Sequence, residues 1–316
     1  MEGTLVKTFV LPGTSLVAPA IVTGMMRIHE KTDAEVRALY EASLASGINF
    51  FDHAAVYGSQ RHGCERRFAE ALKLSPSERD AITLQTKVGI VREDGPYFDF
   101  SYDEIISSVD ASLAALDTDR IDILLLHRPD ALVEPEEVAK AFDELSAAGK
   151  VRHFGVSNHS PAQVELLKKY VSQPLVANQL QLSITHADLI TQGMAINMGA
   201  LDQSVDRTIG TLDYCRLHDI TIQAWSPFQA GFFNGPFLGS PDFPELNAVI
   251  NRLAGEYGVP VEAIATAWIT RHPAQMQVVL GTTTPERVAA AAQGADVVLT
   301  KVEWYELYRA AGHLVP

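Results

Sequence analysis

The sequence has few cysteines, no long hydrophobic run and fewer basic than acidic side chains. Cys64 and Cys215 are the only cysteines among 316 residues, and they lie far apart. This excludes a disulfide-rich secreted framework and a cysteine metal knuckle. No apolar run approaches the ~20 residues that a membrane span requires, and no charged-then-apolar signal segment opens the chain. We therefore expect a cytoplasmic protein without a membrane partner.

The charge balance limits the kinds of partner. Acidic residues outnumber basic ones by 39 to 25, which gives a net charge of −14. Nucleic acids need a basic surface, so no nucleic-acid partner is expected. The net negative charge does not exclude a small anionic ligand, because one local cluster of hydrogen-bond donors can bind it. No obligate protein partner and no metal site is evident from the sequence.

What the sequence does contain is a regular alternation of short apolar runs and segments of helical period. A hairpin is predicted over Leu5–Val10 and Ser15–Ala18, around the turn at Pro12-Gly13. Eight strands are predicted after it, at Ala20–Thr23, Ile48–His53, Ala81–Thr86, Ile121–Leu126, His153–Val156, Leu175–Leu180, Thr221–Ala224 and Gln277–Leu280. Helices are predicted between them at 32–46, 65–74, 102–116, 135–148, 160–171, 206–218, 245–257 with 261–271, and 284–293.

Helix-start signals support this division of the chain. Thr32 with Glu35, and Ser101 with Glu104, have the spacing of capping boxes, and Ser160 precedes a proline at the first helical position. A strand and a helix repeated eight times predict a single-domain (β/α)8 TIM barrel with an N-terminal β-hairpin over residues 1–316. A doubly wound open sheet is the alternative, but no Gly-x-Gly-x-x-Gly follows an early strand.

Three connections are longer than a short turn, and each follows a strand and precedes a helix. They are Arg92–Phe100, Ser183–Val205 and Ser226–Phe243. In a barrel such connections share one rim, where active sites are built. We therefore expect the functional residues at that rim.

Ionisable side chains follow three successive predicted strands. Asp52 ends the second strand with Tyr57 just beyond it, Lys87 follows the third, and His127 follows the fourth. Each one alone is compatible with a structural role, as a cap, a loop tyrosine, a solvent-facing lysine or a core histidine. Because a barrel brings all four to one rim, they indicate an active site.

These residues lie in ordered motifs: Phe51-Asp52-His53-Ala54-Ala55-Val56-Tyr57-Gly58, Lys87 after a hydrophobic strand, Leu124-Leu125-Leu126-His127, and Gly155-Val156-Ser157-Asn158. The ordered set resembles the aldo-keto reductase superfamily, and in particular its bacterial oxidoreductases with short C-termini. The resemblance implies reduction of an aldehyde or ketone to an alcohol, with hydride from NADPH. A small carbonyl compound is the implied substrate.

The resemblance also implies a catalytic tetrad of Asp52, Tyr57, Lys87 and His127. Tyr57 would be the general acid, and a nearby Lys87 ammonium is expected to lower its pKa toward neutrality. Asp52 would keep Lys87 charged. A neutral His127 would orient the substrate carbonyl.

Further residues are implied for the cofactor. Ser157, Asn158 and Gln179 would hold the nicotinamide carboxamide, and Trp225 would stack on the nicotinamide ring. Ser226 and Phe228 would begin the loop around the pyrophosphate. The segment with the family's adenosine-phosphate contacts would supply Gly281, Thr282, Thr283 and Arg287.

This last segment departs from the family pattern. Gly281 stands where a lysine is common, and Ala290-Ala291 stand where Glu-Asn often follows the arginine. Arg287 favours NADPH, but the missing contacts predict weaker NADPH binding and more use of NADH than is typical.

Substrate preference and two alternative functions stay open. Residues expected at the rim suggest an apolar, aromatic pocket: Met25, Met26, His53, Tyr97, Phe98 and Phe100. One alternative is an NADPH-binding regulatory or accessory subunit with little turnover, which an intact tetrad disfavours. The other is a barrel lyase that forms a Schiff base on Lys87, which needs a neutral amine.

Overall fold

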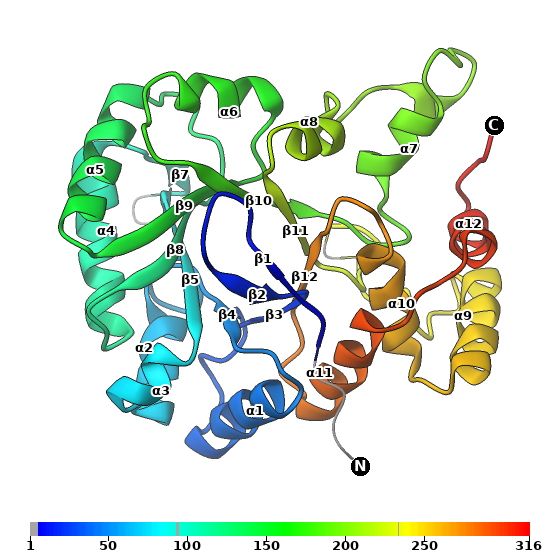
Figure 1. Ribbon diagram of the computed structural model, residues 1–316, viewed down its shortest axis with the longest axis horizontal. Coiled ribbons are helices and arrows are strands. Elements are labelled where there is room, and N and C mark those ends of the chain that lie inside the picture. Colours follow the sequence, from blue (N-terminus) through cyan, green and yellow to red (C-terminus); the bar gives the residue numbers. More distant parts are fainter. Residues whose placement is uncertain (1–5, 93–94, 233) are drawn as a thin grey trace.

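The computed structural model describes residues 6–92, 95–232 and 234–316. Within them, eight parallel strands close into a barrel in the order β10-β11-β12-β3-β4-β5-β8-β9, with helices outside it (Figure 1). The predicted TIM barrel is confirmed, and an open sheet is excluded because the first and last barrel strands pair. The barrel strands are β3 Ile21–Gly24, β4 Phe50–Asp52, β5 Thr83–Val88, β8 Ile121–Leu126, β9 Val151–Ser157, β10 Leu175–Gln181, β11 Thr221–Trp225 and β12 Gln277–Leu280.

The surrounding helices follow the predicted alternation, with additions. They are α1 Asp33–Ala45, α2 Gly63–Leu72, α3 Pro76–Asp80, α4 Tyr102–Ala115, α5 Pro135–Ala147, α6 Pro161–Lys168, α7 Asp188–Met194, α8 Thr211–Leu217, α9 Pro244–Tyr257, α10 Val261–Thr270, α11 Pro285–Ala292 and α12 Lys301–Ala310. The predictions did not include α3, α7 and α12, nor the short pair β6 Ile90–Val91 and β7 Tyr97–Phe98. The predicted helix at 206–218 is wrong at its start, since α8 begins at Thr211.

Two of the three helix-start signals act as predicted. Thr32 and Ser160 form complete capping boxes, with Pro161 at the first turn of α6. Ser101 accepts a hydrogen bond from the backbone of Glu104, but the Glu104 carboxylate pairs with Arg61 instead of returning to the cap. The second capping box is therefore only half formed.

The N-terminal hairpin closes one end of the barrel (Figure 1). Its strands β1 Thr8–Val10 and β2 Val17–Pro19 pair antiparallel, as predicted, and Gly13 adopts a positive φ of 74° in the turn. Leu5, at the start of the predicted hairpin, lies outside the described residues. Leu11 and Ala18 pack among apolar side chains of the barrel strands. The hairpin thus forms a floor, and the long connections lie at the opposite, carboxyl end of the strands.

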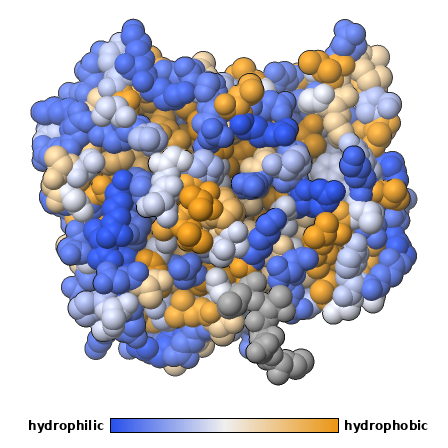
Figure 2. Space-filling model, viewed as in Figure 1, coloured by the Kyte–Doolittle hydropathy of each residue, from blue (hydrophilic) through white to orange (hydrophobic). Residues whose placement is uncertain are grey.

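The face seen in Figure 2 is largely hydrophilic, with apolar residues in separate groups. Throughout the part of the chain that the structure describes, none of the helices is both long enough and apolar enough to cross a membrane.

A chain of glutamine side chains crosses the barrel interior. Gln277 Nε2 donates to the Pro19 carbonyl at 2.8 Å, and Gln223 Nε2 donates to Gln277 Oε1 at 2.9 Å. Gln85 and Gln223 exchange two hydrogen bonds, of 2.9 and 3.0 Å, and Gln85 Nε2 donates to Asp52 Oδ1 at 2.6 Å. All three glutamines are fully buried. This amide chain of Gln85, Gln223 and Gln277 connects the floor to the last residue of β4.

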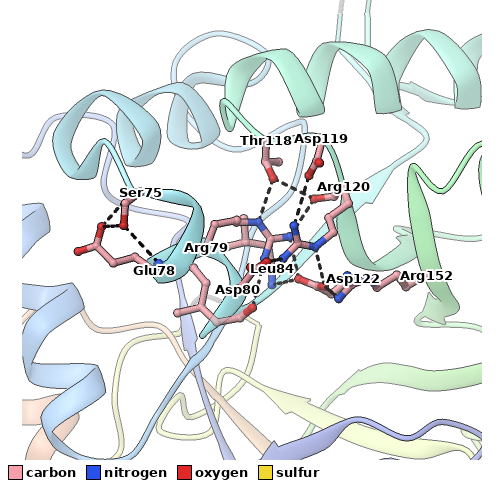
Figure 3. A network of polar contacts seen from close by, with 11 residues as sticks. Ser75, Glu78, Arg79, Asp80, Leu84, Thr118, Asp119, Arg120, Asp122 and Arg152 are labelled. Carbon is pink, nitrogen blue, oxygen red and sulfur yellow. Dashed lines mark hydrogen bonds and ion pairs between the residues drawn. The ribbon is translucent and has the colours of Figure 1, made fainter.

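A buried ionic network fixes the amino-terminal ends of three barrel strands (Figure 3). Arg79 of α3 pairs with Asp122 of β8 at 2.8 Å, and the backbone N–H of Leu84 in β5 donates to the same carboxylate oxygen at 2.9 Å. Arg152 of β9 lies 3.1 Å from the other oxygen, and Arg79 Nε donates to Thr118 Oγ1 at 2.9 Å. One carboxylate thereby links α3, β5, β8 and β9.

Gly155 permits the close approach of β9 and β10. A Cβ atom there would lie 2.7 Å from the Ala177 carbonyl oxygen and 2.7 Å from a Leu125 methyl group. Because the carbonyl belongs to the neighbouring strand, we expect Gly155→Ala to lower the free energy of unfolding by about 1–3 kcal/mol. Urea denaturation measures this. Gly255→Ala is the control, since nothing lies within 4 Å of its added methyl group in α9. Equal destabilisation of both variants would contradict the steric argument.

Candidate active site

Lys87 joins Asp52 and Tyr57 at the carboxyl end of the barrel. Asp52 ends β4, Tyr57 lies in the following loop, and Lys87 lies near the end of β5. Lys87 Nζ lies 2.6 Å from Asp52 Oδ2 and 3.2 Å from the Tyr57 hydroxyl, and it donates to the His53 carbonyl at 2.8 Å. Lys87 is fully buried, so these three oxygens surround a charge that is withdrawn from water.

The electrostatics of this group differ in one respect from the expectation. Burial is the largest single effect and opposes charge on Lys87, but Asp52 and Tyr57 together outweigh it and hold the Lys87 pKa above its usual value. Burial also raises the pKa of Tyr57, and the opposing effect of Lys87 does not cancel this. The expected net lowering of the Tyr57 pKa is therefore wrong for the protein without ligands, because desolvation of the phenolate is the larger effect. Tyr57 is protonated at neutral pH.

His127 directly follows β8 and faces Tyr57. The two ring centroids lie 5.7 Å apart with an edge-to-face angle of 83°. Burial, with smaller effects of Lys87 and other cations, holds the His127 pKa well below its usual value. In the described residues, its buried Nδ1 has no hydrogen-bond partner. A neutral imidazole at this position offers one N–H donor and one acceptor nitrogen.

Three of the six residues expected in an apolar pocket are buried, so the expectation is wrong for them. Met25 and Phe100 belong to the main hydrophobic core, and His53 is fully buried with its ring edge-on to Phe68. Burial lowers the pKa of His53 to about 4. Tyr97 and Phe98 are exposed on β7. The rim position of these residues in sequence did not reveal which way their side chains point.

The residues expected to hold an amide group form one cluster. Ser157 Oγ donates to the Gln179 carbonyl at 3.0 Å, and Asn158 Nδ2 donates to Ser157 Oγ at 2.8 Å. Trp225 Nε1 donates to Asn158 Oδ1 at 3.2 Å, which ties the indole to the cluster. The Gln179 Nε2 group donates to Asp52 Oδ1 and Gln223 Oε1, both at 3.2 Å. The Gln179 side chain therefore has only its amide oxygen, Oε1, to offer a ligand.

Ser226 and Phe228 begin the loop after β11. Ser226 has a positive φ of 54°, and its carbonyl accepts from the Gln229 backbone at 3.1 Å. Phe228 packs against the main core, so only its backbone could contribute to a phosphate site. Residue 233 of this loop lies outside the described residues.

The segment after β12 begins helix α11. Thr284 is the N-cap and Pro285 the first helical residue, but the Thr284 side chain makes no capping hydrogen bond. Thr282 Oγ1 instead accepts from the Thr284 backbone at 3.1 Å. Gly281 and Thr283 are partly exposed, and Arg287 is exposed in the first turn. These hydroxyls and the guanidinium are accessible to a ligand.

A cation that the motifs did not indicate lies beside this segment. Arg27, in the loop after β3, donates from Nη1 to the Gly281 carbonyl at 2.7 Å. Neither Arg27 nor Arg287 pairs with a carboxylate within residues 6–92, 95–232 and 234–316. Parallel pairing of β3 with β12 brings the two loops together, and sequence spacing alone carries no signal of it.

Nowhere in the described chain do three His, Cys, Asp or Glu side chains form a group suited to a metal ion. Both cysteines are buried and unpaired.

Comparisons with known proteins agree with the fold and the motifs. A model described as the aldo/keto reductase family matches residues 20–311. The chain is 37% identical over 302 residues to the 6-dehydroglucose reductase of Agrobacterium fabrum, covering 92% of this chain and 93% of that protein. It is 36% identical over 284 residues to the oxidoreductase YdhF of Escherichia coli, with 87% of each covered. The solved structure of a thermostable aldo-keto reductase, bound to the inhibitor epalrestat, shares the fold, with a TM-score of 0.75, 22% identity, and coverage of 96% of this chain and 99% of that one.

Proposed function

Because this chain belongs to the aldo/keto reductase family, we propose that it reduces a small aldehyde or ketone to the alcohol with hydride from NADPH, with Tyr57 as general acid. Membership makes it an oxidoreductase of carbonyl compounds. The observation that carries the finer proposal is the buried Lys87, bonded at once to Asp52 and to the Tyr57 hydroxyl.

The proposed proton transfer uses the charges of this group. A nicotinamide cofactor held by the amide cluster and Trp225 would provide the hydride for the carbonyl carbon, so negative charge would develop on the carbonyl oxygen. Tyr57 gives its hydroxyl proton to that oxygen, so the product is a neutral alcohol and the phenol becomes a phenolate. The Lys87 ammonium, 3.2 Å away, stabilises the phenolate, and Asp52 keeps Lys87 charged. A phenol that burial keeps protonated suits the reductive direction.

His127 has a separate role in the proposal. As a neutral imidazole it donates one hydrogen bond that orients the carbonyl oxygen toward Tyr57. The lyase alternative is disfavoured, because a Schiff base requires a neutral amine and the Asp52 carboxylate raises the Lys87 pKa.

The residues around the amide cluster suit a nicotinamide cofactor. Ser157, Asn158 and the side-chain oxygen Oε1 of Gln179 provide both donors and acceptors for a carboxamide. Trp225 offers an aromatic face beside them. The segment from Gly281 to Arg287 has a guanidinium near each end and threonine hydroxyls between, which suits a phosphate-bearing nucleotide.

Gly281 stands where a lysine is common in the family. We expect Arg27 to supply the positive charge in place of that lysine, so the preference for NADPH over NADH should be stronger than the motif alone predicts. Arg27→Ala and Arg287→Ala should each lower the ratio of NADPH to NADH affinity about 10-fold, since a charged hydrogen bond to the 2′-phosphate is worth about 1.5 kcal/mol. Quenching of tryptophan fluorescence by each cofactor measures the two affinities. Arg66→Ala is the control, because Arg66 is an exposed residue of α2. An unchanged ratio of NADPH to NADH affinity in both variants would show that these arginines do not contact the 2′-phosphate.

The proposed function is tested by NADPH oxidation with a panel of aldehydes and ketones. Carbonyl-dependent loss of NADPH absorbance is the expected result. Tight NADPH binding with no turnover on any carbonyl would instead support the regulatory subunit, and borohydride trapping of a substrate on Lys87 would support the lyase.

A further inference from the structure

A groove lined by both polar and apolar side chains adjoins the candidate site. It has a volume of about 360 Å³ and lies between the ends of β9, β10 and β11 and the connection that carries α7. Its lining includes Arg128, Asn158, Gln181, Arg207, Trp225 and Phe232. A volume of this size accommodates a small metabolite. Asn158 and Trp225 belong both to the groove and to the amide cluster, so the two sites are continuous.

Arg128 connects the groove to the catalytic group. It directly follows His127, and its guanidinium carbon lies 5.9 Å from the centroid of the Trp225 ring. Burial lowers the Arg128 pKa and the nearby Tyr57 opposes that effect, but a guanidinium stays charged. Across residues 6–92, 95–232 and 234–316, Arg128 forms neither an ion pair nor a side-chain hydrogen bond. A half-buried arginine without a polar partner among the described residues thus lines the groove.

The other polar groups of the groove also favour an acceptor ligand. Gln181 Nε2 is a buried donor, and it has no hydrogen-bond partner in the described chain. Arg207 adds a second cation, whose partner Asp202 lies outside the lining, and Asp188 is the one carboxylate among the lining residues. The groove is therefore locally positive in a chain whose net charge is −14. Anionic oxygens match such a set of donors.

We propose that the groove binds an oxyanion of the carbonyl substrate, a carboxylate or a phosphate, with Arg128 as its main partner. This rests on the proposed function, because it names the substrate class of the same site. Consecutive Cα atoms are ~3.8 Å apart, so the backbone that carries Arg128 adjoins that of His127. An anionic group on a short chain attached to the carbonyl would reach Arg128 while the carbonyl lies at His127 and Tyr57.

The test compares substrates that differ only in the anionic group. Succinic semialdehyde is paired with butanal, and glyceraldehyde 3-phosphate with glyceraldehyde. The wild-type protein should show a higher kcat/KM for the anionic member of at least one pair, by about 10-fold or more, and added salt should reduce this preference. The pair with the larger preference distinguishes carboxylate from phosphate. Arg128→Gln should reduce the ratio of anionic to neutral kcat/KM about 10- to 100-fold, whereas Arg66→Gln should leave it unchanged.

A second readout does not depend on turnover of the anionic substrate. Succinate and inorganic phosphate, which carry no carbonyl to reduce, should inhibit butanal reduction competitively, and Arg128→Gln should weaken that inhibition. Equal kcat/KM within both pairs, or an unchanged ratio in Arg128→Gln, would overturn the groove assignment. These outcomes leave the proposed function intact. Failure of every aldehyde to oxidise NADPH is the distinct result that overturns the proposed function.

Discussion

Tyr57→Phe is expected to lower kcat for carbonyl reduction by about 10²- to 10⁴-fold, because the phenol is the proposed proton donor to the developing alkoxide. The substitution removes one oxygen and keeps the ring that packs edge-on against His127. NADPH affinity should change little, so the loss should appear in kcat under saturating cofactor. Steady-state kinetics and a fluorescence titration separate the two effects.

The same experiment has a matched control and a pH readout. Tyr102→Phe removes a hydroxyl that bonds Glu144 on the outer helices, and it should leave kcat unchanged. Because the Tyr57 pKa is raised, its protonated form persists through neutral pH, so reductive kcat should stay level there and fall only above the ordinary phenol pKa of about 10. Retention of more than a tenth of the activity in Tyr57→Phe would assign the proton donor elsewhere.

Asp122→Asn is expected to lower the free energy of unfolding by about 3–5 kcal/mol, the usual cost of breaking a buried ion pair from one side. The variant leaves the Arg79 guanidinium, only 8% exposed, without its countercharge. It also weakens the acceptor of the Leu84 N–H group. Urea denaturation with an unchanged m-value measures the effect.

Two comparisons test whether burial is the cause. Asp80→Asn removes a 69% exposed carboxylate that pairs with Arg120, and it should cost less than about 1 kcal/mol. The double variant Arg79→Leu with Asp122→Leu removes both charges, so it should be less destabilised than the sum of its single variants. A small loss in Asp122→Asn, similar to that in Asp80→Asn, would show that the network contributes little.

Sequence periodicity was sufficient for the barrel but not for its less regular parts. All eight strands were predicted because each is a short apolar run followed by a helical period. The strand predicted at Ile48–His53 is shorter, and the one at Ala81–Thr86 lies two residues later, at Thr83–Val88. Helix α7 was not predicted, since it is one short segment inside a long connection without a clear apolar stripe.

For the candidate site, the sequence predicted where the residues would lie but not the environment of their side chains. Strand ends indicated where Asp52, Tyr57, Lys87 and His127 would lie, because barrel topology sets the rim. The raised Tyr57 pKa could not be predicted, since desolvation depends on atoms contributed by many distant residues. Arg27 gave no sequence signal either, because its proximity to Gly281 comes from the closure of the barrel.

The amide chain through the barrel gives the N-terminal hairpin a second structural role besides closing one end of the barrel. Pro19 in β2 provides the terminal acceptor for Gln277, and the succession of donors and acceptors continues through Gln223 and Gln85 to Asp52. A truncation that removed β1 and β2 would take away the acceptor of Gln277 and open that end of the barrel to water, so the neighbouring amides could exchange partners. The hairpin over residues 8–19 is therefore part of the scaffold that aims the Asp52 carboxylate, although it lies at the far end of the barrel from it.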